Sequence, residues 1–296
     1  MKIILTITNS KGNSILFVSD NLQTNSLKKA IELAKNKILE DIYVVHRKTG
    51  DYLRTNRKKG NSLDHLSISL NTFLSSINDI NKILVLPSLK GYFDSYQNLL
   101  INQEQKGEDI IRIDGFLRST KKHVKEKLLP YKQLIFDSSN KFAIDPYLLG
   151  AILIDEIARL SPFEDIIDKL IAEHLNYNSS VGIAQIMIET ARILIRTGYY
   201  NPDPNNERLN RKNINKTPRS YLYQYIIGSK DNIYFSAAFV RYLIDRWKNE
   251  ADVNLTQEII ATLYSLDRTP HANPQPNSRG LQIVNEFIIL AKEILN

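Results

Sequence analysis

The spacing of apolar and polar positions changes along the chain, from strand-like alternation near the start to helical spacing later. Residues 2–8 and 13–18 are rich in β-branched and apolar side chains and are separated by a Lys-Gly-Asn turn, which predicts a hairpin. Residues 26–39 then place apolar side chains on one face and lysines on the other, as in an amphipathic helix. A second hairpin is expected over residues 41–55. Residues 1–68 are therefore predicted to form a small α/β module.

The rest of the chain is predominantly helical in its pattern. Residues 69–115 carry mixed signals and are predicted to be a partly helical connector. Residues 116–296 show repeated amphipathic spacing and are predicted to form an all-helical domain. One of its helices has a clear start, because Asp145 is a suitable N-cap and Pro146 suits the first helical turn. The stretch 198–220 is rich in Pro, Asn and basic residues and predicts a long loop. The expected fold class is α+β.

Composition restricts the chemistry without deciding it. Thirty-nine Lys and Arg against 32 Asp and Glu give a net charge of +7, so anionic polymers or surfaces are candidate partners, although a solvated basic surface explains the same charge. The absence of cysteine excludes disulfides, thiolate zinc sites and a cysteine nucleophile. The histidines have no metal-ligand spacing and no phosphate-binding glycine loop is present, so neither a metal nor a cofactor is expected. The first residues predict no export signal and no membrane span, which leaves the compartment open.

A carboxylate interrupts the apolar face of the helix predicted after Pro146. Leu149, Ile152 and Leu153 lie on that face, and the position one turn further on is Glu156 rather than an aliphatic residue. Burial favours the protonated form of a glutamate, and a glutamic acid that is protonated near neutral pH can act as a general acid. The alternative is a glutamate that turns to solvent or pairs with the arginine three residues on. Glu156 is the candidate catalytic residue.

Residues 180–191 combine a turn with an apolar pattern. Ser179, Ser180 and Gly182 predict the turn, and a helix after it would place Ile183 and Met187 on an apolar stripe. Gln185 and Glu189 would then lie together on a different face, one helical turn apart. A glutamine amide both donates and accepts hydrogen bonds, which suits the hydroxyl and acetamido groups of a sugar, although most helical glutamines are surface residues.

Four segments resemble, in order, the four motifs of the soluble lytic transglycosylase family, which has a lysozyme-like fold. They are "YLLGAILIDEIAR", "SSVGIAQIMIETA", "DNIYFSAAFVRYLIDRW" and "IATLYSLD", within residues 130–296. The most specific match is the turn with Gly182, Gln185 and the Thr-Ala pair at 190–191.

The resemblance implies a role for individual residues. Glu156 matches the single glutamate that acts as general acid and base on the bond between N-acetylmuramic acid and N-acetylglucosamine. The family needs no second carboxylate, unlike most glycosidases. Tyr264 matches the tyrosine near the catalytic carboxyl group, and Asn232 opens the third motif. The positions expected to contact substrate are Ile183, Gln185, Met187, Glu189, Asn232 and Tyr264.

The chain also departs from the family pattern. Ile157 replaces the serine that usually follows the glutamate, and Ser265, Leu266 and Asp267 replace an asparagine, a small residue and a glycine after the tyrosine. A catalytically inactive, glycan-binding or scaffolding protein with the same fold is therefore an alternative. A nucleic-acid-binding protein is a second alternative, because aromatic and basic residues alternate in residues 199–225 and the net charge is positive.

The first module resembles a small bacterial domain of unknown function. The resemblance rests on the "YVV" and "YLRT" sequences within residues 43–55 and on the stretch 62–66. It implies no chemistry, and an adaptor role is the simplest interpretation. The expected partners of the chain are peptidoglycan glycan strands and, through the first module, a protein partner; a monomer is expected.

Overall fold

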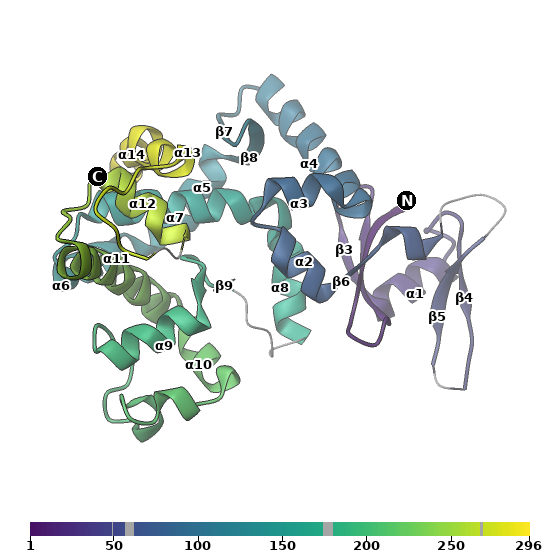
Figure 1. Cartoon of the computed structure of the whole chain (residues 1–296). Coiled ribbons are helices and arrows are strands. Elements are labelled where there is room, and N and C mark those ends of the chain that lie inside the picture. The colour runs from purple at the N-terminus through teal and green to yellow at the C-terminus, as the bar shows by residue number, and fades with distance from the viewer. Residues whose placement is uncertain (49, 57–61, 174–179, 267–268) are drawn as a thin grey trace. The chain divides into compact units, whose positions relative to one another are not determined.

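The computed structural model has a mixed α+β fold and describes residues 1–48, 50–56, 62–173, 180–266 and 269–296. Contacts within the chain divide it into two compact units (Figure 1). Unit 1 comprises Met1–Thr120 and Arg159–His174, and unit 2 comprises Lys121–Ala158 and Leu175–Asn296. The segment 69–115, predicted as a connector, therefore belongs to unit 1, and a later helical segment returns to it.

The first module of unit 1 contains both predicted hairpins. A four-stranded sheet has the order β3-β2-β1-β6, in which β1 pairs antiparallel with β2 and parallel with β6. The predicted helix is confirmed as α1, and Ser26 caps it by accepting a hydrogen bond from the Lys29 backbone N–H. The second hairpin is confirmed as β4 and β5, although Thr49 of its turn lies outside the described residues. The bounds are β1 Ile3–Thr8, β2 Ser14–Ser19, β3 Thr24–Ser26, α1 Leu27–Lys35, β4 Ile42–Val45, β5 Tyr52–Thr55 and β6 Ser67–Ser69.

The segment predicted as a connector supplies much of the unit 1 core. Helix α4 packs against β1 and β8, and Phe73 and Phe93 meet Phe163 with ring centroids 5.9 and 6.4 Å apart. The hairpin β7-β8 was not predicted, because its second strand begins where the helical pattern was expected to start. The bounds are α2 Leu70–Ser76, α3 Ile80–Val85, α4 Pro87–Gln105, β7 Ile110–Ile113, β8 Phe116–Thr120 and α8 Glu164–Glu173.

The described residues of unit 2 are helical apart from one very short hairpin, β9-β10, so the prediction of an all-helical domain needs this correction. Helix α11 packs against α6, α9, α10 and α12, and buries Trp247 completely. The predicted start of α7 is confirmed, because the Asp145 carboxylate accepts a hydrogen bond of 2.8 Å from the Tyr147 backbone N–H. The bounds are α5 Lys121–Leu128, α6 Lys132–Phe142, α7 Pro146–Leu160, β9 Ser180–Val181, β10 Ile186–Met187, α9 Ile188–Thr197, α10 Arg219–Ile226, α11 Ser229–Ala251, α12 Gln257–Ser265, α13 Ser278–Gln282 and α14 Ile288–Leu295.

The predicted loop lies between α9 and α10. It contains short 3-10 turns at Glu207–Leu209 and Ile214–Lys216 and no α-helix before Arg219, as expected. Arg192 of α9 holds the loop by donating hydrogen bonds to the backbone carbonyls of Ile214 and Thr217.

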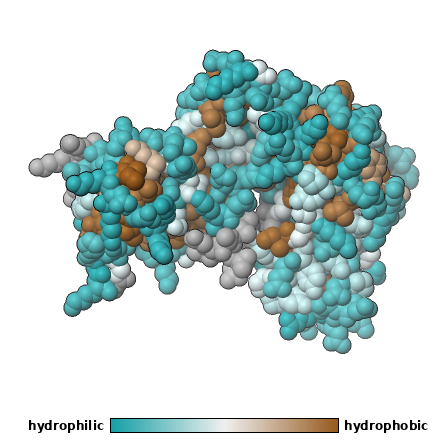
Figure 2. Space-filling model, turned by 180° about the vertical axis from the view of Figure 1, so that it is seen from behind, coloured by the Kyte–Doolittle hydropathy of each residue, from teal (hydrophilic) through white to brown (hydrophobic). Residues whose placement is uncertain are grey.

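Hydrophobic side chains on the face drawn in Figure 2 form separate patches between hydrophilic ones. Scattered apolar side chains of this kind are normal on a protein surface. Within the described ranges, no helix has both the length and the apolar character needed to cross a membrane.

Candidate active site

Helix α7 places Glu156 deep in the protein. Leu149, Ile152 and Leu153 are at most 1% exposed, and Glu156 itself is only 6% exposed. The glutamate is thus buried, as its place on the apolar face predicted. Its carboxylate accepts a hydrogen bond of 2.5 Å from the guanidinium of Arg279 on α13. Arg159, which follows Glu156 by one helical turn, donates a hydrogen bond of 2.8 Å to the Asp114 carboxylate.

Arg279 joins two neighbouring carboxylates of α7. Its Nε donates to Asp155 at 2.7 Å, while one of its terminal nitrogens contacts both Asp155 and Glu156 at 2.5 Å. Burial alone would lower the pKa of the Arg279 guanidinium, but the charges of the two carboxylates and the hydrogen bonds to them raise it above its ordinary value. The guanidinium is therefore charged at any physiological pH.

The acidic residues in and after α7 lie in different surroundings. Asp165 and Asp168 are exposed. Asp155 is completely buried. Sequence spacing could not show this, because α7 is buried on every side from Leu148 onward and has no solvated face there.

The segment with Gln185 is a hairpin and not the start of a helix. Strands β9 and β10 pair across a turn, in which Gly182 has φ +73° and Gln185 has φ +48°. Helix α9 begins only at Ile188, so the prediction that Gln185 and Glu189 share a helix face is wrong. The left-handed backbone at Gln185 ends any helical path at that residue. Its side-chain amide donates a hydrogen bond of 2.7 Å to the Gly182 carbonyl.

Two helices fix this turn through Ala184. The Ala184 backbone N–H donates to the side-chain oxygen of Asn232 on α11 at 2.7 Å, and the Ala184 carbonyl accepts from the Tyr264 hydroxyl on α12 at 2.9 Å. The Asn232 amide is fully buried and also donates to the Ile226 carbonyl at 3.0 Å. Gly182 lies so close that a Cβ there would come within 2.6 Å of the Asn232 side chain. Asn232 and Tyr264 are therefore positioning residues for the turn.

Tyr264 links the turn to the carboxylate. Its hydroxyl donates to Ala184, so the 2.8 Å contact with the buried Ser236 is best described with the serine hydroxyl as donor. Burial raises the pKa of the Tyr264 hydroxyl, and the negative charge of Glu156 raises it further. A neutral phenol and a buried carboxylate thus act on each other in the same region of unit 2.

The remaining predicted residues lie toward solvent. The Met187 side chain on β10 is 47% exposed, and Ile183 in the turn is partly buried. Glu189 on the first turn of α9 binds Arg192 at 3.1 Å and Arg219 at 2.9 Å. Gln185, Met187 and Glu189 are therefore partly or largely exposed, whereas Glu156 is buried.

Three of the positions that depart from the family pattern are described by the structure. Two of them are apolar, and the third forms a hydrogen bond within its own helix. Ile157 is buried, with 8% of its surface exposed. The Ser265 hydroxyl donates to the Thr262 carbonyl at 3.1 Å, within its own helix. Leu266 is partly buried, and Asp267 lies outside the described residues.

Arg279, Ser236 and the backbone of Ala184 were not identified from the sequence. The arginine lies in "NPQPNSRG", outside the four quoted segments, and nothing in its local pattern indicates a buried partner. Among the described residues, no group of three or more His, Asp and Glu side chains could hold a metal ion.

No protein-family model matches this chain, and no curated protein matches it.

Proposed function

We propose that unit 2 cleaves the glycan strands of peptidoglycan between N-acetylmuramic acid and N-acetylglucosamine, in the manner of a lytic transglycosylase. Glu156 would protonate the glycosidic oxygen as the C1–O bond breaks. The C6 hydroxyl of the muramic residue would then attack C1, lose its proton to the same carboxylate and close a 1,6-anhydro ring. This reaction needs one carboxyl group and no attacking water, unlike the two-carboxylate hydrolysis of most glycosidases.

The observation that supports the proposal is that residues of all four resembling segments act on one another or on the same turn. Glu156 of the first segment raises the pKa of Tyr264 in the fourth, and Tyr264 in turn binds the turn that bears Gln185 in the second. Asn232 of the third segment binds the same turn. Tyr264 and Asn232 thus both bind the turn that bears Gln185, and the charge of Glu156 acts on Tyr264, although these residues are far apart in the sequence.

Arg279 favours a second candidate function. A guanidinium 2.5 Å from Glu156 favours the ionised carboxylate, whereas a general acid must carry a proton. A protein that binds glycan strands without cleaving them would have no need to protonate Glu156. For cleavage to occur, substrate binding must weaken the contact between Arg279 and Glu156.

The test is to incubate the wild type and Glu156→Gln with purified peptidoglycan and to identify released muropeptides by mass spectrometry. The anhydro product is lighter than the hydrolytic product by one water, so one measurement separates the two reactions. The wild type is expected to release anhydro-muropeptides, and Glu156→Gln is expected to lose at least about 100-fold in rate, as is usual when an acid-base group is removed.

Glu250→Gln is the matched control, because it removes a carboxylate of unit 2 that is 54% exposed and lies outside the four resembling segments. It is expected to keep most of the activity. Equal activity of Glu156→Gln and the wild type would remove Glu156 from the mechanism. If neither protein releases product but both sediment with peptidoglycan in high salt, the non-catalytic binding function is correct. Retention on DNA that salt abolishes would instead support nucleic-acid binding.

A further inference from the structure

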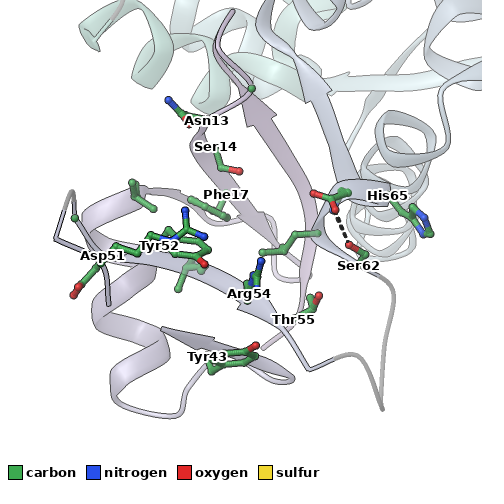
Figure 3. A pocket seen from close by; sticks show the side chains of 17 residues that line it. Asn13, Ser14, Phe17, Tyr43, Asp51, Tyr52, Arg54, Thr55, Ser62 and His65 are labelled. Carbon is green, nitrogen blue, oxygen red and sulfur yellow. Dashed lines mark hydrogen bonds between the residues drawn. The ribbon is translucent and has the colours of Figure 1, made fainter. Parts of the chain in front are cut away.

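Unit 1 contains an open pocket of about 1040 Å³ that the proposed glycan chemistry does not use (Figure 3). A volume near 1000 Å³ is at the upper end of the range for ligand sites. Strand β5 forms one wall, and the beginning of β2 and the turn at 62–65 form others. Polar side chains from all three walls line it, among them Asn13, Arg54 and Ser62.

The pocket follows the free edge of β5. Consecutive residues 51–55 all line it, although their side chains alternate between the two faces of the strand, so the pocket must run beside the backbone. Strand β5 pairs only with β4 in the part of the chain that the structure describes. Its other edge is therefore open to the pocket.

The alternation of hydrogen-bonded and non-bonded residue pairs in the β4-β5 hairpin shows which backbone groups of β5 point away from β4. The Asn56 backbone N–H donates to the Asp41 carbonyl, which makes these two residues a hydrogen-bonded pair. Such pairs alternate with non-bonded pairs in an antiparallel ladder, so the pairs that include Leu53 and Thr55 are non-bonded. The N–H and C=O groups of Leu53 and Thr55 consequently point away from β4, toward the pocket.

Positive charge lies along the same edge. Arg47 and Arg54 both approach the Tyr52 ring, with the guanidinium carbons 4.4 and 5.7 Å from the ring centroid. Both arginines are exposed, and neither forms a salt bridge to a residue within the described ranges. Two carboxylates also line the pocket: Asp51 is bound by Lys35 at 3.0 Å and by His46 at 2.6 Å, and Asp64 accepts a hydrogen bond of 3.2 Å from the Ser62 hydroxyl. The two guanidinium groups are therefore available to an anionic ligand.

The two sides of the edge differ in chemistry. Tyr52 and Arg54 lie on one face of β5, while Leu53 on the other face belongs to the core cluster with Phe17 and Leu63. A strand added to β5 would continue both faces, so its residues would alternate between the arginine side and the apolar side.

We propose that this pocket binds an extended acidic peptide segment of a partner protein, which adds a strand to β5. Backbone groups of the peptide pair with Leu53 and Thr55. The carboxylates of the peptide bind Arg54 and Arg47. The apolar side chains, at alternate positions of the peptide, lie on the same face as Leu53, near Phe17 and Leu63. Strand addition to an exposed sheet edge is a common mode of peptide recognition, in which backbone hydrogen bonds give affinity and alternate side chains give specificity. This site is independent of Glu156.

The test uses the full chain and a fluorescein-labelled peptide of alternating glutamate and valine, six residues long, with binding followed by fluorescence anisotropy. The wild type is expected to bind this peptide and not the corresponding lysine–valine peptide. Arg54→Ala is expected to weaken binding about tenfold through loss of a charged hydrogen bond. Arg196→Ala, which removes an exposed arginine from unit 2, is the matched control and is expected to leave binding within about twofold.

Two further measurements separate strand addition from simple charge attraction. A glutamate–valine peptide methylated on alternate backbone nitrogens keeps its charge but cannot pair as a strand, and it is expected not to bind. Thr55→Pro removes an outward N–H without removing a bond of the β4-β5 ladder, and is expected to weaken binding about tenfold or more. Equal binding of the methylated peptide, or unchanged binding by Arg54→Ala, would overturn the proposal. Tighter binding of a ten-nucleotide oligothymidine that Arg54→Ala abolishes would show a nucleic-acid site instead.

Discussion

Two glutamates from the resembling segments, Glu156 and Glu189, each bind arginine, but in opposite surroundings. The side chains of Glu156 and Arg279 are 8% and 18% exposed. Those of Glu189 and Arg219 are 41% and 53% exposed. The first pair joins α7 to α13 in the interior, whereas the second joins the beginnings of α9 and α10 at the surface.

The difference shows that burial decides how much such a contact matters. Removing one partner of a buried pair leaves an uncompensated charge away from water, which costs much more than the pair itself contributes. An exposed pair exchanges its contact for water with little change in free energy. The two glutamates should therefore respond very differently to loss of their arginines.

The largest effect is expected from Arg279→Met, which leaves the buried carboxylates of Asp155 and Glu156 without the guanidinium. We expect the free energy of unfolding to fall by about 3–5 kcal/mol in urea denaturation. A triple variant that also carries Asp155→Asn and Glu156→Gln should recover most of this loss, because all three charges of this buried cluster are then removed. A loss below about 1 kcal/mol for Arg279→Met would contradict the importance given to this buried contact.

An intermediate effect is expected from Gly182→Ala in the turn beside the site. Alanine tolerates φ +73° poorly, and its Cβ would approach the Asn232 side chain to 2.6 Å. We expect a loss of about 2–4 kcal/mol from backbone strain and overpacking together. Gly12→Ala is the matched control, since Gly12 has a similar φ of +76° and nothing within 4 Å of the added Cβ. Equal losses for both variants would mean that contact with Asn232 contributes nothing.

The smallest effect is expected from Arg219→Met, which we expect to change the unfolding free energy by less than about 1 kcal/mol. Burial opposes ionisation of Glu189, but hydrogen bonds from Arg219 and Arg192 and their charges lower its pKa below the ordinary 4.5. A carboxylate whose pKa is lower in the folded state than in the unfolded chain stabilises the folded state at pH values above its ordinary pKa. This contribution is lost as the pH falls through the pKa of the folded state.

The same pair gives a pH test of small magnitude. The melting temperature of Glu189→Gln should lie slightly below that of the wild type at pH 7, and the gap should close as the pH is lowered below 4.5. A gap that widens on acidification would mean that the arginines do not favour the ionised form of Glu189.

The local sequence pattern predicted those elements that are determined by residues close together in the chain. The hairpins of the first module, the capped start of α7 and the loop before α10 follow from alternation, an Asp-Pro sequence and a Pro- and Asn-rich stretch. Helical spacing failed at residues 180–187, because apolar residues at helical intervals also fit a turn followed by a short strand. It also missed the β7-β8 hairpin, since strands of four and five residues give a weak periodic signal.

The sequence by itself determined that a carboxyl group would occupy an apolar helix face, because the spacing of Leu149, Ile152 and Leu153 leaves that place to Glu156. Only the tertiary structure decided what meets it there. Arg279 lies 123 residues further along the chain, and Tyr264 and Asn232 act on the Gln185 turn from two other helices. Periodicity reports the environment of a residue on its own element, whereas the partner of a buried charge depends on how distant elements pack.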